Sequence, residues 1–202
     1  MKGKAMDYKE FFERQKYECR LPRWDELPDI ELYMDQVITL MGKYFGWLSP
    51  QDEPVLTPSM INNYVKIGII PAPIKKKYSR THLFRLIIIC VMKRVLPIND
   101  ISALIETLLE TRTEEEVLDI FTSRYEEECF NTMSLLESSL EKNAEEEESE
   151  TALSLSVIHA AAIAGGYIIF SEYALSELRK CAEPPENQSK KSPRKNKSEV
   201  CE

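Results

Sequence analysis

Apolar residues recur at spacings of three and four along most of this 202-residue chain, and no stretch of any length alternates apolar and polar residues. The first spacing marks one face of a helix, whereas alternation marks a half-buried strand. The segment from Ile30 to Leu48 shows the helical spacing clearly, with a stripe that includes Val37, Met41 and Phe45. The pattern therefore predicts an all-α fold, in a chain long enough to bury one sizeable core.

Proline and capping residues divide this pattern into separate helices. Thr57 is a favoured N-cap and Pro58 follows it at the first helical position, so a short helix is expected from there to about Lys66. Two prolines bar a helix from residues 69–77, which we expect to form an extended loop.

Three longer helices are expected after that loop, with a short one between the first two. Ser79 should cap a helix whose sequence, LFRLIIICVMKRVL, is apolar on nearly every side and therefore central to the core. Asn99 or Asp100 then caps a short amphipathic helix, and Thr113 opens a longer one with three glutamates in its first turn. The last helix is expected over residues 152–180, after an acidic stretch (145–150) that is a linker or a frayed turn.

Charge is distributed unevenly along the chain. The formal net charge is −8, yet residues 57–94 carry eight Lys and Arg side chains and no Asp or Glu. Residues 99–150 carry seventeen carboxylates against three cationic side chains. Such a separation indicates a localised anionic partner. The alternative explanation is a basic face that pairs with the acidic face inside the fold.

The cysteine and histidine content indicates neither a metal site nor a disulfide framework. The five cysteines are odd in number and widely spaced, without a CxxC motif or a Cys/His cluster, and Cys90 is expected to be a buried thiol. We expect His82 and His159 to be packed or capping residues. No phosphate-binding glycine loop and no nucleophile–base pair occurs, so the sequence predicts neither an enzyme nor a cofactor.

The segment from Thr151 to Phe170 has no charged residue over twenty positions, about the length of a membrane span. It is rich in alanine and contains His159 and two glycines, so a helix packed inside the protein explains it equally well, and we expect that packed helix. The N-terminus lacks the apolar core of a signal peptide. A cytoplasmic protein is therefore expected.

The order of elements in residues 29–110 is that of a helix-turn-helix. A short capped helix held against a longer one can enter the major groove, while the following loop contacts phosphates as a wing. On the short helix Ile61 and Val65 face inward, which leaves its polar residues free. Asparagine can read adenine with two hydrogen bonds, and lysine can reach guanine or a phosphate.

Three motifs in this region resemble the MerR family of transcriptional regulators. TPSMINNYVKIGIIPAP is similar to the family's capped helix followed by "xGLLPPP". KKYSRTHLFRL resembles its basic-x-Tyr-Ser-x-x-Asp-Leu-x-Arg-Leu motif, and LPINDISALI resembles "G(F/L)SLxEIxxL". ELPDIELYMDQVITLM followed by LTPSMINNYVK also looks like a branch of Firmicute proteins regarded as MerR-like regulators.

The resemblance implies a winged helix-turn-helix that binds duplex DNA. Together with the residue chemistry it predicts eleven DNA-binding residues: Ser59, Asn62, Asn63, Tyr64, Lys66, Lys75, Lys76, Lys77, Tyr78, Arg80 and Arg85. Three departures stand out, because the loop before Tyr78 is shorter than the usual wing, His82 replaces the usual acid, and Asn62 replaces a more common arginine. We therefore expect a reduced wing.

The predicted organisation has four parts: an N-terminal extension (1–28), a MerR-like helix-turn-helix domain (29–110), a C-terminal helical hairpin for dimerisation or effector binding (111–181), and a disordered tail (182–202). Ala160, Ala164 and Gly165 would permit close helix approach in a homodimer. The predicted function is sequence-specific transcriptional regulation, with an effector that the sequence does not identify. The alternatives are a module that binds an acidic protein, and a membrane-anchored regulator.

Overall fold

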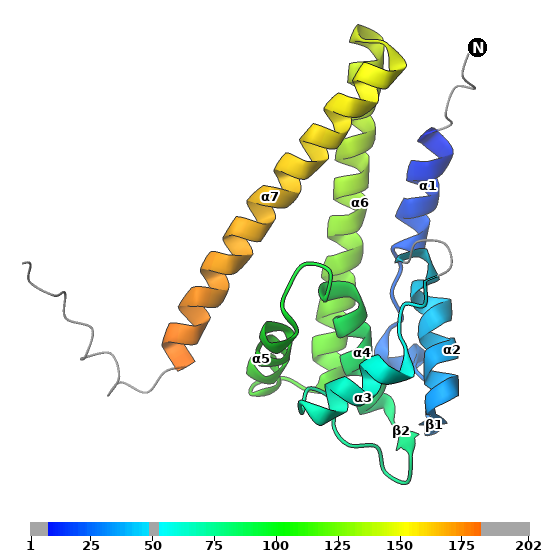
Figure 1. Cartoon of the computed structure of the whole chain (residues 1–202), viewed down its shortest axis with the longest axis vertical. Helices are drawn as coiled ribbons and strands as arrows, with labels where there is room; N and C mark the ends of the chain where they lie inside the picture. Colours follow the sequence, from blue (N-terminus) through cyan, green and yellow to red (C-terminus); the bar gives the residue numbers. More distant parts are fainter. Residues whose placement is uncertain (1–7, 49–52, 183–202) are drawn as a thin grey trace, which may run out of the picture. The chain divides into compact units, whose positions relative to one another are not determined.

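The computed structural model describes residues 8–48 and 53–182 (Figure 1). The predicted tail beyond Ala182 and the first seven residues of the N-terminal extension lie outside these residues. The chain divides into two units, one up to His159 and one from Ala160.

The described residues are mostly helical, which confirms the all-α prediction. The elements are α1 (Tyr8–Glu18), the 3₁₀ helix η1 (Trp24–Glu26), β1 (Leu32–Tyr33), α2 (Met34–Phe45), the 3₁₀ helix η2 (Gly46–Leu48), α3 (Pro58–Lys66), β2 (Lys77–Tyr78), α4 (Arg80–Met92), α5 (Ile98–Leu109), α6 (Glu114–Glu146) and α7 (Ser149–Ala182).

Helix α4 is the centre of the first unit, as its sequence predicts. Every residue from His82 to Val91 is buried, and α2, α3, α5 and α6 contribute side chains to the same core. Fully buried side chains such as Leu86 and Ile87 each contribute roughly 1.5–3 kcal/mol relative to exposure. The helices that flank α4 are therefore held in place by one continuous apolar cluster.

Two very short strands depart from the prediction of a strand-free chain. β1 and β2 pair antiparallel, with Leu32 opposite Tyr78 and Tyr33 opposite Lys77. Two residues are too few to show alternation in a sequence, so the pattern gave no signal. The pairing also explains why α2 begins at Met34 and not at Ile30, where the helical spacing of the sequence begins.

Helix α1 runs alongside α6 in the first unit (Figure 1). A second apolar cluster joins Phe12 of α1, Leu140 of α6 and Ala152 of α7. Cys19, just after α1, forms a disulfide with Cys129 of α6, so the prediction that the cysteines form no disulfide is wrong. The two cysteines are 110 residues apart in sequence, and only the packing of α1 on α6 brings them together.

The first part of α7 packs against α6. Ala152 is buried, Ser139 Oγ lies 2.8 Å from His159 Nδ1, and Asn143 Nδ2 donates to Ser156 Oγ at 3.1 Å. The acidic run 145–150 is predicted to be a linker or a frayed turn; α6 continues to Glu146, and only Glu147 and Glu148 separate it from α7. Glutamate is a good helix former, which favours this continuation.

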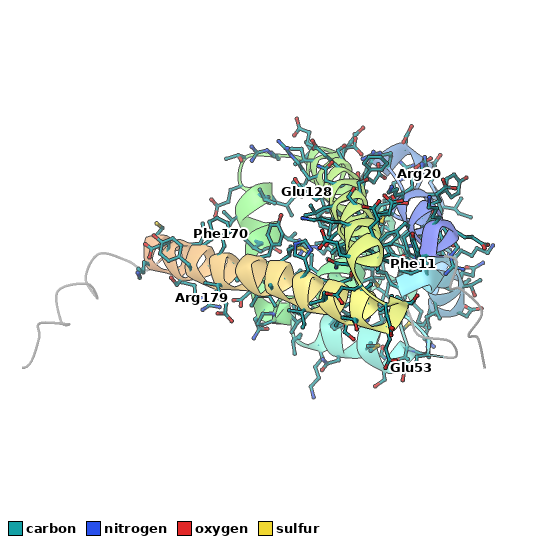
Figure 2. All side chains as sticks on the ribbon, turned by 90° about the horizontal axis from the view of Figure 1, so that it is seen from above. Phe11, Arg20, Glu53, Glu128, Phe170 and Arg179 are labelled. Carbon is teal, nitrogen blue, oxygen red and sulfur yellow. A yellow bond between two sulfur atoms is a disulfide. The ribbon has the colours of Figure 1, made fainter. Side chains whose placement is uncertain are left out.

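From Ala160 onward, α7 belongs to the second unit and exposes many apolar side chains. The largest are Tyr167, Ile168, Ile169, Phe170 and Tyr173, of which Phe170 is labelled in Figure 2. The segment Ser149–Cys181 is long and apolar enough to cross a membrane by length and composition alone.

Candidate nucleic-acid interface

Helix α3 is set in place by its cap and two inward-facing residues. The Thr57 hydroxyl accepts a hydrogen bond from the Met60 backbone N–H at 3.2 Å, and Pro58 occupies the first turn, as predicted. Ile61 and Tyr64 lie in the core. The helix ends before Gly68, whose φ of 78° is the left-handed conformation that glycine adopts most easily.

The opposite face of α3 is polar and exposed. Ser59, Asn62, Asn63 and Lys66 all lie on it, as their spacing predicts. This face carries amide, hydroxyl and ammonium groups and no carboxylate. Such groups can donate hydrogen bonds to base edges or to phosphate oxygens.

The basic loop closes in a two-residue turn. Lys77 N–H donates to the Ile74 carbonyl at 2.9 Å, and the turn continues into β2, which pairs with β1. The two central residues, Lys75 and Lys76, have φ angles of 50° and 65°. The wing predicted from the sequence is therefore a tight hairpin turn with a lysine at each central position.

This turn is strained by its own sequence. Turns with positive φ at both central residues favour Asn-Gly, and a residue with a β-carbon costs about 1 kcal/mol or more in the left-handed region. Both lysine side chains are exposed, so packing does not explain their presence. Strain of this kind is a reason to look for function at Lys75 and Lys76.

Four of the eleven predicted DNA-binding residues lie inside the domain or bind to it. Tyr64 and Tyr78 are 7% and 2% exposed, and burial raises the pKa of both phenols. Arg85 is 8% exposed and donates to the Ile69 carbonyl at 3.1 Å and to Glu106 at 2.6 Å. These three side chains stabilise the fold beneath the predicted DNA-binding face and are not exposed on it.

Arg80 is the fourth. Its guanidinium donates twice to the Leu27 carbonyl, at 3.1 and 2.9 Å, and pairs with Asp29. It also lies 5.7 Å from the centre of the Trp24 ring. Arg80 therefore ties the start of α4 to the segment before β1.

Five of the eight cations in the basic segment lie against partners inside the domain. Arg80 and Arg85 pair with acids, and Lys77 lies 3.8 Å from Glu31 and 5.8 Å from the Tyr33 ring centre. Lys93 and Arg94 donate to the backbone carbonyls of other elements: Val55 at 2.7 Å and Leu48 at 2.8 Å.

Three cations remain after this pairing. Lys66, Lys75 and Lys76 form no ion pair with any residue that the structure describes. Internal pairing therefore accounts for part of the basic segment, and the remaining charge lies on α3 and the turn. We refer to Ser59, Asn62, Asn63, Lys66, Lys75 and Lys76 as the α3–turn surface.

His82 stabilises the segment that joins β2 to α4, next to this surface. Its Nδ1 accepts a hydrogen bond from the Ser79 backbone N–H at 2.9 Å, so His82 caps α4. The MerR motif that the sequence resembles has an acid at this position. Burial lowers the pKa of the imidazole, which keeps the ring neutral and its Nδ1 lone pair available. Its ring packs edge-on against Tyr78, 5.3 Å between centres.

Sequence reasoning missed the acids that lie beside the basic segment. Asp29 and Glu31 lie in the segment between η1 and β1, Glu106 lies on α5, and no local pattern connects them with their partners. Among the described residues, no group of three or more His, Cys, Asp or Glu side chains is placed to hold a metal ion.

Comparison with known proteins gives one match. A family model described as a domain of unknown function, DUF1836, matches residues 22–133. The match contains α2 to α5 and the first part of α6, and leaves out α1 and α7. No curated protein matches the chain, and no solved structure does.

Proposed function

The chain belongs to the DUF1836 family, and we propose that it is a transcriptional regulator that binds duplex DNA through the α3–turn surface. One observation carries the proposal. Of the eight cations in residues 57–94, Lys66, Lys75 and Lys76 have no ion pair or carbonyl partner among the residues that the structure describes, and these three lie on α3 and on the turn before β2. In this proposal residues 29–110 act as the MerR-like winged helix-turn-helix domain that the sequence motifs predict.

The two parts of the surface have different roles in this proposal. Asn62 and Asn63 read base edges in the major groove, where asparagine can contact adenine with two hydrogen bonds. Lys75 and Lys76 contact phosphates, which adds affinity without sequence preference. A tight turn supports such contacts because it holds both ammonium groups on a fixed backbone.

The proposal includes a homodimer held by the second unit. Apolar side chains from Tyr167 to Tyr173 are exposed there, and a large exposed apolar patch is typical of an interaction site. A two-fold dimer also matches a palindromic operator. A monomeric mass at micromolar concentration, measured by light scattering, would contradict this part of the proposal.

A cytoplasmic location fits α7 better than a membrane span. The hydrogen bonds of Ser156 and His159 hold the first part of the charge-free segment against α6. The charge-free remainder, residues 160–171, is about 18 Å long at the helical rise of 1.5 Å per residue. A membrane core needs about 30 Å.

Two variants test DNA binding. We expect Lys75→Ala/Lys76→Ala to weaken binding to specific and random duplexes alike, and to reduce the slope of log K against log salt by about 2. We expect Asn62→Ala to change the preference among sequences selected from genomic fragments. Lys142→Ala, which removes one exposed lysine on the acidic α6, is the control.

The outcomes separate the proposal from its main alternative. If the double lysine variant binds every duplex as the wild type does, DNA is not the partner of this surface. That result would favour an acidic protein as the partner. Failure of the wild type to bind any duplex at low salt would favour it too.

A further inference from the structure

Cys19 and Cys129 are the only cysteines joined to one another within the described residues, with Cα atoms 6.3 Å apart. Figure 2 labels Arg20, which follows Cys19, and Glu128, which precedes Cys129 on α6. We propose that this pair is a reversible redox site that accepts small-molecule disulfides as its oxidant.

Contacts on the α1 side hold the two cysteines together without the bond. Lys16 Nζ lies 2.6 Å from the Glu137 carboxylate, with both side chains only one-fifth exposed, and 5.5 Å from the Phe130 ring centre. One helical turn before Lys16, Phe12 packs against Leu140. Both contacts join α1 to the part of α6 beyond Cys129.

Contacts on the other side of Cys19 do the same with the part of α6 before Cys129. The Leu21 backbone N–H donates to Glu126 Oε1 at 2.8 Å, and Arg23 donates to Glu126 Oε2 at 2.6 Å. Arg23 also donates to Ser123 Oγ at 2.9 Å. Two thiols held between such contacts react with each other at a high effective concentration, so a mild oxidant is sufficient.

The difference in exposure sets the order of the exchange. Cys129 is partly exposed, whereas Cys19 is 2% exposed. The Cys129 thiolate attacks the small disulfide, forms a mixed disulfide and releases one small thiol. The Cys19 thiolate then attacks Cys129 Sγ and releases the second small thiol. Two electrons pass from the two cysteines to the small disulfide, and the two cysteine protons end on the two small thiols.

The compartment argument rests on the proposed function. A protein that binds chromosomal DNA works where thiols are kept reduced, and disulfides in that compartment are typically transient and redox-sensing. Cys90 differs from the pair, because burial raises the pKa of its thiol to about 11 and makes it unreactive near neutral pH. Cys90 therefore serves as an internal control for oxidation that is not specific to the Cys19–Cys129 pair.

The bond controls how firmly α1 is attached. α1 and Cys19 lie outside the residues that match the family model, while Cys129 lies inside them. Oxidation thus joins α1, which lies outside the residues matched by the family model, covalently to α6 inside them. α1 also covers Leu140 and Ala152 near the junction of α6 and α7, so the looser attachment of α1 in the reduced form would expose this apolar patch more often.

The test is a redox titration of the full chain carrying Cys181→Ser and Cys201→Ser, which removes intermolecular pairing. The reduced protein is equilibrated with mixtures of reduced and oxidised glutathione, quenched in acid and alkylated, and peptides are quantified by mass spectrometry. We expect a reversible two-electron transition in which Cys19 and Cys129 become linked while Cys90 stays a thiol. Proteolysis between α1 and η1 should be several-fold faster in the reduced form.

Three outcomes would overturn the proposal. They are stable glutathione adducts at Cys129 without a link, a link between other cysteines, and a link that persists in a large excess of reduced glutathione, which would mark a purely structural bond. The titration needs neither DNA nor a variant at the pair. If the protein bound no DNA but showed the expected redox transition, only the proposed function would be contradicted.

Discussion

The α3–turn surface and the contact between the N-terminal segment and α6 both contain charged side chains, but these charges have different partners. On α6, Glu137 and Glu126 each pair with a cation from the N-terminal segment at 2.6 Å. On the α3–turn surface the lysines have no ion-pair partner among the described residues, and two lie in strained backbone. The paired charges hold the N-terminal segment on α6. The unpaired lysines of the turn are available to an anionic ligand.

The largest expected effect lies in the α1–α6 contact. We expect Cys19→Ser/Cys129→Ser to lower the free energy of unfolding of the oxidised protein by about 2–4 kcal/mol, because the bond restricts the unfolded chain over a long sequence separation. Urea unfolding measures the change. Equal stability of the double variant and the oxidised wild type would show that the bond does not stabilise the folded protein in solution.

The next effect concerns the support of the α3–turn surface. Arg85→Met keeps the length of the side chain but leaves the Ile69 carbonyl and Glu106 without their partner, so we expect a loss of about 2 kcal/mol. Lys76→Met is the matched control on the surface and should change stability by less than about 0.5 kcal/mol. Similar losses in both variants would remove the distinction between supporting and exposed cations.

A third change separates stability from binding in the turn itself. Lys75→Asn/Lys76→Gly supplies the residues that this turn favours, so we expect it to stabilise the fold by about 1 kcal/mol while weakening DNA binding. Urea unfolding and fluorescence anisotropy on the same samples measure the two effects. A stabilised variant with unchanged affinity would show that the strained lysines have no role in binding.

The smallest expected effect is a pH dependence at His82. Burial, the main cause, lowers the pKa of the imidazole; Glu114 raises it and Arg85 lowers it. The unfolded state, with its pKa near 6.5, then binds more protons than the folded state. Stability is therefore complete above pH 6.5 and falls as the pH drops toward the folded pKa.

His82→Gln provides the control for this pH dependence, because glutamine can still accept from the Ser79 N–H but does not titrate. The fall in stability below pH 6.5, followed by thermal unfolding, should be smaller in the variant. An unchanged slope would assign the pH dependence to other groups.

Much of the fold could be predicted because its signals are local. Thr57 and Pro58 mark the start of α3, Thr113 marks the start of α6, and the run of apolar residues after Ser79 marks the buried α4. Each signal depends only on residues within one or two helical turns, so a single sequence contains it.

The rest depends on contacts between distant residues. The pairing of β1 with β2 and the Cys19–Cys129 bond join segments far apart in the chain. In the candidate site, spacing predicted that Asn62 and Lys66 are exposed, but it could not show that Arg85 turns inward to Glu106. Composition identified the basic segment, whereas only the folded chain separates its paired cations from its unpaired ones.

The two-residue turn also affects the entropy of any binding event at this surface. Ordering the backbone of one residue costs about 1–2 kcal/mol, and a flexible loop bears this cost when a ligand arrives. Here the hydrogen bond from Lys77 to Ile74 and the pairing of β2 with β1 order the backbone of Lys75 and Lys76 during folding. A polyanion that meets these two ammonium groups therefore restricts only their side chains, and contact formation can be fast.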